Sequence, residues 1–381
     1  MKISFFILFF LVSVLSHAKG VSDHSIVFGQ SADLTGVAQH LGVNMRAGIL
    51  AAFEEANKEG GIYGRKLKLI SLDDSYEPES AIINTRTFIN KYKVFALIGA
   101  VGTPTSKAVA SIVSEANIPY IGPFTGAEFL RDPSQKNVVN VRASYYQEIR
   151  NIVERLVSDL KIKKISILYQ DDSYGQAGFT GLEMALKKKN MEIASSGVYM
   201  RNTTAVKTAL LDIMAGQPEA VLIVGAYRPA ADFIKKARTV NFNPLFLSLS
   251  FVGTNALYKE LENHLTPVVI TQVVPFPYNV RNSLVASYQK AVKDNFNFVS
   301  LEGYLVGKFT VMALKEAGRR LTAEKFVKAI RQIKQFSVDG FPLQYGLKDN
   351  QGSDKVFLTA IFKGQLFPIS NLKAFQDESK E

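Results

Sequence analysis

The sequence predicts an α/β protein of two similar halves, each with a parallel sheet covered by helices on both faces. Short β-branched apolar runs alternate with segments of helical period, the alternation restarts near Val141, and no low-complexity linker interrupts it. Strands that alternate with helices in this way are typical of parallel sheets. With 381 residues, 47% hydrophobic and 21% charged, the chain is long and apolar enough to fill two domain cores.

The first half is predicted from the period of its apolar residues. Runs of apolar and β-branched residues indicate strands, and apolar positions repeated every three or four residues indicate helices. We expect strands at 25–30, 66–74, 94–100 and 118–124, with helices at 43–61, 79–93 and 106–117.

The second half repeats this alternation. We expect helices at 148–160, 178–190, 206–215 and 230–240, and strands at 163–172, 192–200, 220–226 and 244–250. A weak internal echo, LDDSYEP at 72–78 and QDDSYGQ at 170–176, supports two related halves. Beyond them, the prolines of 273–279 indicate a crossing between the halves, followed by helices at 300–318 and 322–334 and short strands at 341–346 and 355–363.

The N-terminal residues 1–18 are predicted to be a secretory signal peptide. Lys2 precedes the apolar run from Ile3 to Leu15, and Ser16-His17-Ala18 offers small residues at a cleavage site. The alternative, a transmembrane anchor, needs roughly 18–20 apolar residues. The chain has no cysteine, which excludes zinc–thiolate sites and a lipid-modified cysteine. We therefore expect a free periplasmic protein rather than a lipoprotein.

The net charge of +11 raises the question of nucleic-acid binding. The basic residues are spread along the chain, and the longest cluster, Lys187 to Lys189, falls at a predicted helix end, where cations suit the helix dipole. Export makes nucleic acid an unsuitable partner, and we expect none. An acidic ligand and an anionic membrane surface both remain possible binding partners.

The stretch LIGAVGTPTSKA at 97–108 resembles an anion-binding loop. A nucleotide P-loop requires G-x-x-x-x-G-K-[ST], and here Ser106 precedes Lys107, so order and spacing both exclude it. Thr103, Thr105 and Ser106 still place hydroxyls at a helix start, where backbone N–H groups are free to hold a carboxylate. These residues could instead serve only as helix caps. A second glycine-bearing turn, IGPFTGAEFL at 121–130, follows the neighbouring strand.

No catalytic or metal-binding motif is visible. The aspartate pairs at 73–74 and 171–172 could hold magnesium, but they stand in different halves and are better read as turn and cap residues. The four histidines have no ligand spacing, and G-x-S-x-G is absent. We predict no metal, no cofactor and no enzyme activity.

The mature chain, from about Ser25 to Ile369, resembles the periplasmic solute-binding proteins of the branched-chain amino acid type, which are type I periplasmic binding proteins that feed ABC transporters. The motifs that carry the resemblance are LTGVAQHLG (34–42), AFEEANKEGGIYGRKLKLISLDDSYEP (52–78), VFALIGAVGTPTSKAV (94–109), IPYIGPFTGAEFLR (118–131), ISILYQDDSYGQAG (165–178) and AVLIVGAYRPAADFIKKAR (220–238).

The resemblance implies two Rossmann-like lobes joined by a three-strand hinge, with a ligand held between them. The implied boundaries are 19–140 and 279–338 for lobe I, 141–278 and 339–370 for lobe II, and 371–381 for a C-terminal tail.

The resemblance also implies the ligand-binding residues. Thr103 matches the hydroxyl that grips the ligand carboxylate. Phe124, Thr125 and Gly126 cover a second contact turn, in which the family's threonine falls on Gly126 and the donor moves to Thr125. Tyr174 and Tyr227 match tyrosines of the second lobe, and Leu41 stands where some members carry an aromatic residue.

One departure concerns the ligand. Members that bind amino acids commonly place an acidic residue where this chain has Ser250 and Phe251. A buried ammonium group without a counter-charge is costly. Either Glu148 or another acid substitutes, or the ligand lacks an α-amino group. Phe124 and Phe251 favour an apolar or aromatic ligand body, and Arg228 could serve a second carboxylate.

The predicted function is that of the substrate-binding protein of an ABC importer, whose partners are a small ligand and an inner-membrane permease complex. An amino acid, an aromatic or aliphatic carboxylate, an amide and a purine-like compound all remain candidate ligands. Two alternative functions also stay open. One is a periplasmic sensor that signals to a receptor or kinase, and the other is a periplasmic hydrolase.

Overall fold

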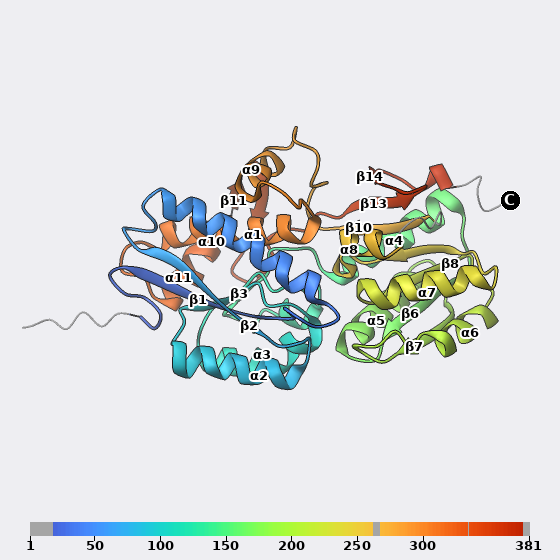
Figure 1. Ribbon diagram of the computed structural model, residues 1–381, viewed down its shortest axis with the longest axis horizontal. Coiled ribbons are helices and arrows are strands. Elements are labelled where there is room, and N and C mark those ends of the chain that lie inside the picture. The colour runs from blue at the N-terminus through green and yellow to red at the C-terminus, as the bar shows by residue number, and fades with distance from the viewer. Residues whose placement is uncertain (1–17, 262–266, 334, 376–381) are drawn as a thin grey trace, which may run out of the picture.

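The computed structural model describes residues 18–261, 267–333 and 335–375 of the 381-residue chain. The predicted signal peptide, except Ala18, and the last six residues of the predicted tail, 376–381, lie outside these ranges. The described chain forms two lobes that lie side by side along the long axis of the molecule (Figure 1). Lobe I contains strand β1 (Ser25–Ala32), and lobe II contains strand β6 (Ile165–Gln170).

Lobe I is built on a five-stranded sheet in the order β2-β1-β3-β4-β5, in which all neighbours run parallel. The other strands are β2 (Lys66–Asp73), β3 (Ala96–Ile98), β4 (Tyr120–Ile121) and β5 (Val138–Val139). The strand predicted at 118–124 is shorter than expected because Gly122 adopts a left-handed conformation, with φ 53°, and ends it.

The helices of lobe I come from two distant parts of the chain. They are α1 (Gln39–Lys58), α2 (Pro78–Thr87), α3 (Thr103–Glu115), α9 (Ser283–Val292), α10 (Phe298–Ala317) and α11 (Ala323–Ile333), with a π-helical turn at Phe88–Tyr92 and a 3-10 turn at Glu128–Leu130. In Figure 1 the orange α10 packs beside the blue α1. A Cβ added at Gly48 of α1 would lie 2.5 Å from the Tyr304 nitrogen of α10, so the two helix backbones are in close contact.

Lobe II is built on a seven-stranded sheet in the order β14-β13-β10-β9-β8-β6-β7. Its other strands are β7 (Ile193–Tyr199), β8 (Ala220–Val224), β9 (Leu245–Ser248), β10 (Val268–Gln272), β13 (Phe357–Phe362) and β14 (Gln365–Ile369). The helices are α4 (Tyr145–Leu160), α5 (Ser173–Lys187), α6 (Lys207–Ala215), α7 (Tyr227–Thr239) and α8 (Thr254–Leu261), with 3-10 turns at Ser250–Val252 and Lys373–Phe375. The strands from β7 to β10 are parallel, and the C-terminal β13 and β14 add an antiparallel edge.

Three segments connect the lobes, at about 140–144, 273–282 and 345–356. The first and third run side by side, because Asn140 N donates to Asn350 O at 2.7 Å and Gly352 N donates to Asn140 O at 2.9 Å. Before the third crossing, the chain forms a hairpin of β11 (Gln335–Val338) and β12 (Phe341–Gln344).

This hairpin moves the last lobe boundary. The ring centroid of Phe336 in the hairpin lies 5.1 Å from that of Phe309 in α10, and the ring of Tyr345 stacks on Phe309 at 5.3 Å. The hairpin therefore belongs to lobe I, and the chain crosses after residue 345 rather than at the expected boundary between residues 338 and 339.

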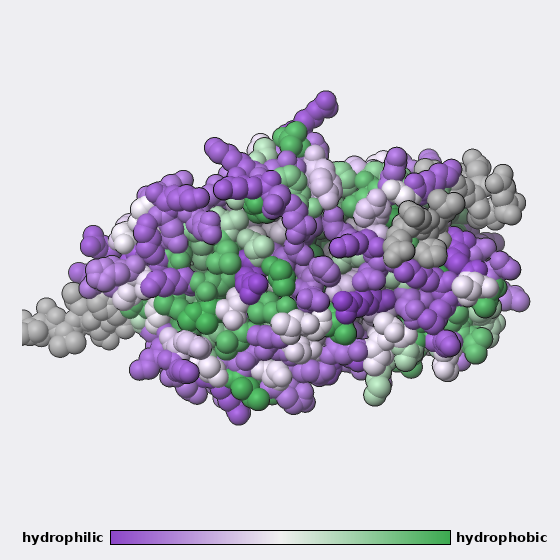
Figure 2. Space-filling model, viewed as in Figure 1, coloured by the Kyte–Doolittle hydropathy of each residue, from purple (hydrophilic) through white to green (hydrophobic). Residues whose placement is uncertain are grey.

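The carboxyl ends of the two sheets meet at the interface between the lobes. Gln170 Nε2, at the end of β6, donates to Tyr76 Oη, just after β2, at 3.3 Å. Polar side chains cover most of the visible surface, and smaller apolar patches lie mainly over lobe I (Figure 2). None of the helices in the described part of the chain combines the length and the apolar composition needed to cross a bilayer.

Candidate functional site

Helix α3 presents its first residue to the interface between the lobes. Its N-cap, Gly102, has φ 112°, a conformation that favours glycine. Thr103 follows and is fully buried. Its Oγ1 lies 2.7 Å from Thr125 Oγ1 and 3.4 Å from Tyr145 Oη. We call these three side chains the hydroxyl cluster. It lies at the first turn of α3, where Thr103 and Thr105 keep backbone N–H groups without an intrahelical partner and Pro104 has none.

The other two predicted hydroxyls of this turn serve lobe I itself. Thr105 Oγ1 donates to Val101 O at 2.7 Å and to Gly102 O at 3.1 Å. Ser106 Oγ accepts from Tyr120 Oη at 2.9 Å. Both hydroxyls therefore have partners within the lobe, but neither acts as the helix cap that the alternative expected, because Gly102 is the N-cap and no side chain caps the start of α3. The structure does not bring either of them into the hydroxyl cluster.

The second predicted turn has no room for a side chain at Gly126. A Cβ at Gly126 would lie 2.6 Å from the Tyr145 nitrogen, which leaves no room for a side chain. Gly126 O accepts from that same nitrogen at 2.7 Å. Thr125 is free of this constraint, and its hydroxyl reaches Thr103.

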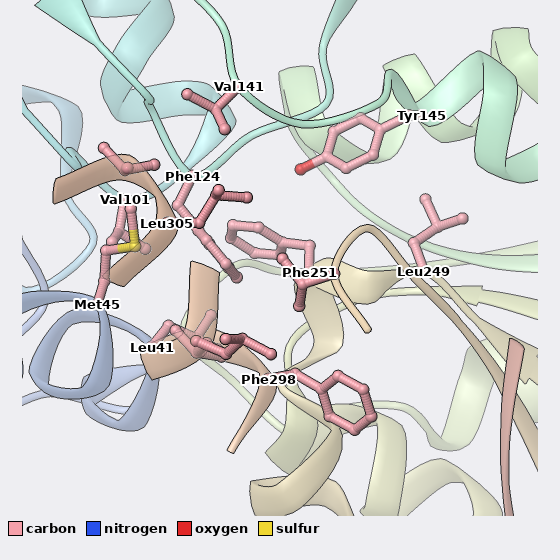
Figure 3. Packing of buried hydrophobic residues seen from close by; sticks show 14 of the residues in the cluster. Leu41, Met45, Val101, Phe124, Val141, Tyr145, Leu249, Phe251, Phe298 and Leu305 are labelled. Carbon is pink, nitrogen blue, oxygen red and sulfur yellow. The ribbon is translucent and has the colours of Figure 1, made fainter. Parts of the chain in front are cut away.

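Aromatic side chains of both lobes meet next to the hydroxyl cluster. The Phe251 ring of lobe II lies 4.6 Å from Tyr174 of the same lobe, and 5.5 Å and 6.1 Å from Phe124 and Tyr76 of lobe I. Tyr145 lies 5.2 Å from Tyr174. In Figure 3, Phe124 and Phe251 face each other and the Tyr145 hydroxyl points toward them. We call Tyr76, Phe124, Tyr145, Tyr174 and Phe251 the aromatic cluster.

Tyr174 is held at this interface by a helix cap. Asp172 Oδ1 accepts from Tyr174 N at 2.8 Å and from Gly175 N at 3.3 Å, which starts α5. The Tyr174 hydroxyl is buried and has no hydrogen-bond partner among the described residues. Burial also raises the pKa of Tyr174 well above its ordinary value, so the hydroxyl stays protonated and able to donate.

Tyr227 belongs to a different place at the same interface. Its ring lies 5.3 Å from the His40 ring of lobe I. His40 and Leu41 line a cavity of about 240 Å³ together with Gly253, Asn255 and Lys259 of lobe II. Nearby, Arg228 Nε lies 3.7 Å from Glu260 Oε1, which gives this arginine a carboxylate partner in the protein. Leu41 and Tyr227 thus lie together near Gly253, and Leu41 also packs in the same buried core as Phe124 and Phe251 (Figure 3).

Sequence reasoning missed the buried cation of this site. Arg142, on the first crossing segment, is almost fully buried, and its guanidinium carbon lies 4.8 Å from the centroid of the Phe124 ring. Its Nη2 lies 3.5 Å from Glu148 Oε1 and donates to Ser250 Oγ, and its Nη1 lies 3.6 Å from Glu302 Oε1. Adjacent acids raise the pKa of Arg142 although desolvation lowers it.

Ser250 and Glu148 form one buried polar unit. Glu148 Oε2 accepts from Ser250 N at 2.9 Å and from Thr271 Oγ1, and Oε1 accepts from Ser250 Oγ at 3.0 Å. Glu148 is a candidate substitute for a missing acid, and the structure shows that it is already committed to protein groups.

The aspartate pairs are turn residues. Asp73 Oδ1 accepts from Leu34 N at 2.8 Å, and Asp74 Oδ1 accepts from Tyr76 N at 2.9 Å. Asp172 caps α5. Within the described ranges no cluster of histidine, aspartate or glutamate has the arrangement of a metal site.

Comparison with known proteins identifies the family. A family model described as "Periplasmic binding protein" matches residues 25–365. The chain belongs to this family of periplasmic binding proteins. Its members are solute-binding proteins rather than enzymes, and the family implies a periplasmic location.

Solved and curated relatives agree with this membership. A crystal structure of a possible leucine/isoleucine/valine-binding protein from Rhodopirellula baltica is 37% identical to this binding protein, covers 91% of it and 97% of its own chain, and superimposes with a TM-score of 0.87. The Leu/Ile/Val-binding protein homolog 7 of Brucella abortus is 24% identical over 61% of this chain, and this chain spans 60% of that relative's length. The fatty acid ABC transporter substrate-binding protein of Thermomonospora curvata, at 21% identity, covers 93% of this chain and 94% of its own and shares the fold with a TM-score of 0.80.

The predicted site residues of this binding protein fall into three groups. Thr103, Phe124, Thr125, Tyr174, Ser250 and Phe251, with the Gly126 backbone, lie around the hydroxyl and aromatic clusters. Leu41 and Tyr227 lie together beside the cavity of about 240 Å³ that Leu41 lines. Thr105 and Ser106 bond within lobe I. Tyr76, Tyr145, Arg142 and Glu302 were not predicted. For Arg142, the sequence signal was its charge in the crossing segment NVRAS at 140–144, because arginine is seldom fully buried unless it is paired.

Proposed function

We propose that this periplasmic binding protein is the substrate-binding component of an ABC importer and closes its lobes on a small carboxylate-bearing ligand, an amino acid or a related compound. The relatives named for leucine, isoleucine and valine support an amino acid. The fatty-acid protein of the same fold supports the wider class of carboxylates, because the fold alone does not require an ammonium group on the ligand.

The observation that carries this proposal is the hydroxyl cluster at the start of α3. The buried hydroxyls of Thr125 and Tyr145 lie 2.7 Å and 3.4 Å from the buried Thr103 Oγ1. The N-terminus of a helix adds unpaired N–H groups and a partial positive charge, which together favour an anion. The unpartnered Tyr174 hydroxyl adds a donor from lobe II.

Closure follows from the division of this site between the lobes. Thr103, Thr125, Phe124 and Tyr76 belong to lobe I, whereas Tyr145, Tyr174 and Phe251 belong to lobe II. These aromatic side chains contact one another, so a ligand must enter while the lobes are apart. A ligand that contacts both sides stabilises the closed state, and one that contacts a single lobe does not.

Thermal unfolding with a ligand panel tests the proposal. The protein is unfolded in guanidinium, dialysed and refolded, and then mixed with amino acids, aliphatic and aromatic acids, amides and nucleobases. A ligand at about 100 times its Kd adds roughly 2.7 kcal/mol of stability. We expect a carboxylate to raise the melting temperature, and a panel without any such hit contradicts the proposal.

Two threonine variants and a serine control assign the site. Thr103→Val and Thr125→Val remove hydroxyls of the cluster while keeping the shape, and each is expected to weaken carboxylate binding at least tenfold in calorimetry. Ser106→Ala removes a hydroxyl three residues further along α3 that accepts from Tyr120 Oη, outside the hydroxyl cluster, and it should leave the affinity unchanged. If all three variants bind the carboxylate with the same affinity, the ligand does not contact the hydroxyl cluster.

We also propose export and a permease partner. Cleavage after Ala18 would leave a mature protein that starts at Lys19, and mass spectrometry of the periplasmic fraction tests this start. In proteoliposomes, the ligand-loaded protein is expected to stimulate ATP hydrolysis by its permease complex. Recovery of the unchanged ligand after binding would exclude a hydrolase.

A further inference from the structure

The carboxylates around the aromatic cluster are already bound to protein groups. Asp33 accepts from Gly36 N and Ala38 N, and Asp74 accepts from Ser31 Oγ and Tyr76 N. Asp172 accepts from two backbone N–H groups of α5 and from Gln170, and its Oδ2 lies 3.5 Å from Arg201 Nη1. Each of these acids closes a turn or caps a helix, so releasing one for a ligand would break local structure.

Both carboxylate oxygens of Glu148 are also occupied by protein groups. Both of its oxygens accept hydrogen bonds, from the backbone and hydroxyl of Ser250 and from the hydroxyl of Thr271, and Oε1 also lies 3.5 Å from Arg142 Nη2. A carboxylate that is saturated in this way cannot take a ligand ammonium group without losing a partner.

Glu302 is the remaining buried acid at this place. It lies 3.6 Å from Arg142 Nη1. Burial, together with the neighbouring Glu148, raises the pKa of Glu302 to about 7 although Arg142 lowers it. Because Glu302 already pairs with Arg142, its charge is balanced within the protein and is not free for a ligand cation.

Arg142 provides positive charge at the same place. Its Nε and Nη1 are buried and have no hydrogen-bond partner within the described part of the chain. Its guanidinium lies over the Phe124 ring, at the edge of the aromatic cluster. Arg142 and the Tyr174 hydroxyl thus both carry unused donors beside the aromatic cluster, and both favour a negative or neutral acceptor.

We propose that the ligand of this binding protein is a carboxylate with an apolar body and no ammonium group. This inference rests on the proposed function and narrows its substrate class. The carboxylate takes the hydroxyl cluster and the helix start, and the body lies against the rings of Phe124, Tyr174 and Phe251. An α-amino acid would bury its ammonium group beside Arg142 and among rings, without a free counter-charge, and such burial costs several kcal/mol.

Matched pairs of ligands test this inference in the wild-type protein. Calorimetry compares 4-methylpentanoate with leucine, 3-phenylpropanoate with phenylalanine, and propanoate with alanine, because each pair differs only in the amino group. We expect at least one deaminated acid to bind at least tenfold more tightly than its amino acid. Equal or tighter binding of the amino acids overturns the inference and leaves the proposed importer function standing.

A neutral analogue and a variant complete the experiment. The amides of the same acids are expected to bind at least tenfold more weakly, and equal binding of an amide counts against the carboxylate in the proposed function itself. If none of these compounds binds to protein of native circular dichroism, the apolar carboxylate class is excluded.

Glu302→Gln removes a negative charge beside Arg142, so it should strengthen binding of the acids several-fold. A loss of amino-acid binding in this variant would instead identify Glu302 as an ammonium site.

Discussion

Arg201 of lobe II and Glu77 of lobe I form an ion pair across the interface, with Nη2 and Oε2 2.6 Å apart. Asn202 Nδ2 donates to the other oxygen of Glu77 at 2.7 Å and to Ser75 O at 3.2 Å. These contacts link the loop after β7 to the loop after β2, and none of them uses a residue of the hydroxyl cluster. The closed arrangement is therefore stabilised in part by a direct contact between the lobes, which we call the latch.

The latch predicts a change in ligand release. Glu77→Gln should raise the dissociation rate of a bound ligand by about two- to fivefold, because partly exposed ion pairs contribute at most about 1 kcal/mol. Stopped-flow measurements check this, and the difference from wild type should shrink at high salt. Glu79→Gln, an exposed neighbour on α2, serves as the control. An unchanged release rate in Glu77→Gln would show that the latch does not influence closure.

The buried charges of the hinge predict a large loss of stability. Arg142→Met leaves Glu148 and Glu302 without their cation, and breaking a buried pair in this way costs about 3–5 kcal/mol. The free energy of unfolding in urea measures the loss. Arg228→Met removes a pair with Glu260 whose side chains are 38% and 39% exposed, and it should cost less than about 1 kcal/mol. Similar losses in both variants would contradict this account.

The contact between α1 and α10 predicts intolerance to a single methyl group. Gly48→Ala would place a Cβ 2.5 Å from the Tyr304 nitrogen, so the helices must move apart at a cost of about 1–3 kcal/mol. Gly181→Ala is the matched control, since its nearest atoms are the ends of the Ile149 and Tyr146 side chains, which can shift. A lower melting temperature for Gly48→Ala alone is the expected result.

Asp74 predicts a pH-dependent effect. Burial, with smaller contributions from Asp33 and Asp73, raises the pKa of Asp74 from 3.8 to about 7, although hydrogen bonds from Ser31 and Tyr76 oppose the rise. The folded state thus binds this proton more tightly, and the stability it gives is present below pH 3.8 and lost as the pH rises toward 7. Asp74→Asn should gain on wild type by up to about 1.4 kcal/mol per pH unit between pH 5 and 7.

Asp73 is the control of opposite sign. Its pKa is lowered, because hydrogen bonds from Leu34, Thr35 and Ser75 outweigh desolvation. The stability that Asp73 contributes is therefore present above its ordinary pKa and lost on acidification. Urea unfolding of Asp73→Asn should show a deficit at neutral pH that narrows in acid. A parallel pH profile for both variants would refute the two assignments.

The alternation of strands and helices was readable because each element buries one face against a sheet, and this burial leaves a period in the sequence. Thr103 and Tyr174 could be predicted for a related reason, since both follow strands at the edge where parallel sheets place their ligands. Arg142 and Glu302 could not, because they are 160 residues apart and only the folded chain pairs them. The sequence also could not show that the Thr105 and Ser106 hydroxyls bond within lobe I, because hydroxyl residues at the start of a helix can serve either the protein or a ligand.

The paired first and third crossings have a consequence for folding. Asn140 meets Asn350 and Gly352 only after more than half of the chain has been made. Lobe I also needs α10, and the lobe II sheet needs β13 and β14, which end at Ile369. Contacts of such long sequence separation slow folding. Neither lobe can therefore complete its core until α10 and β14 have been synthesised.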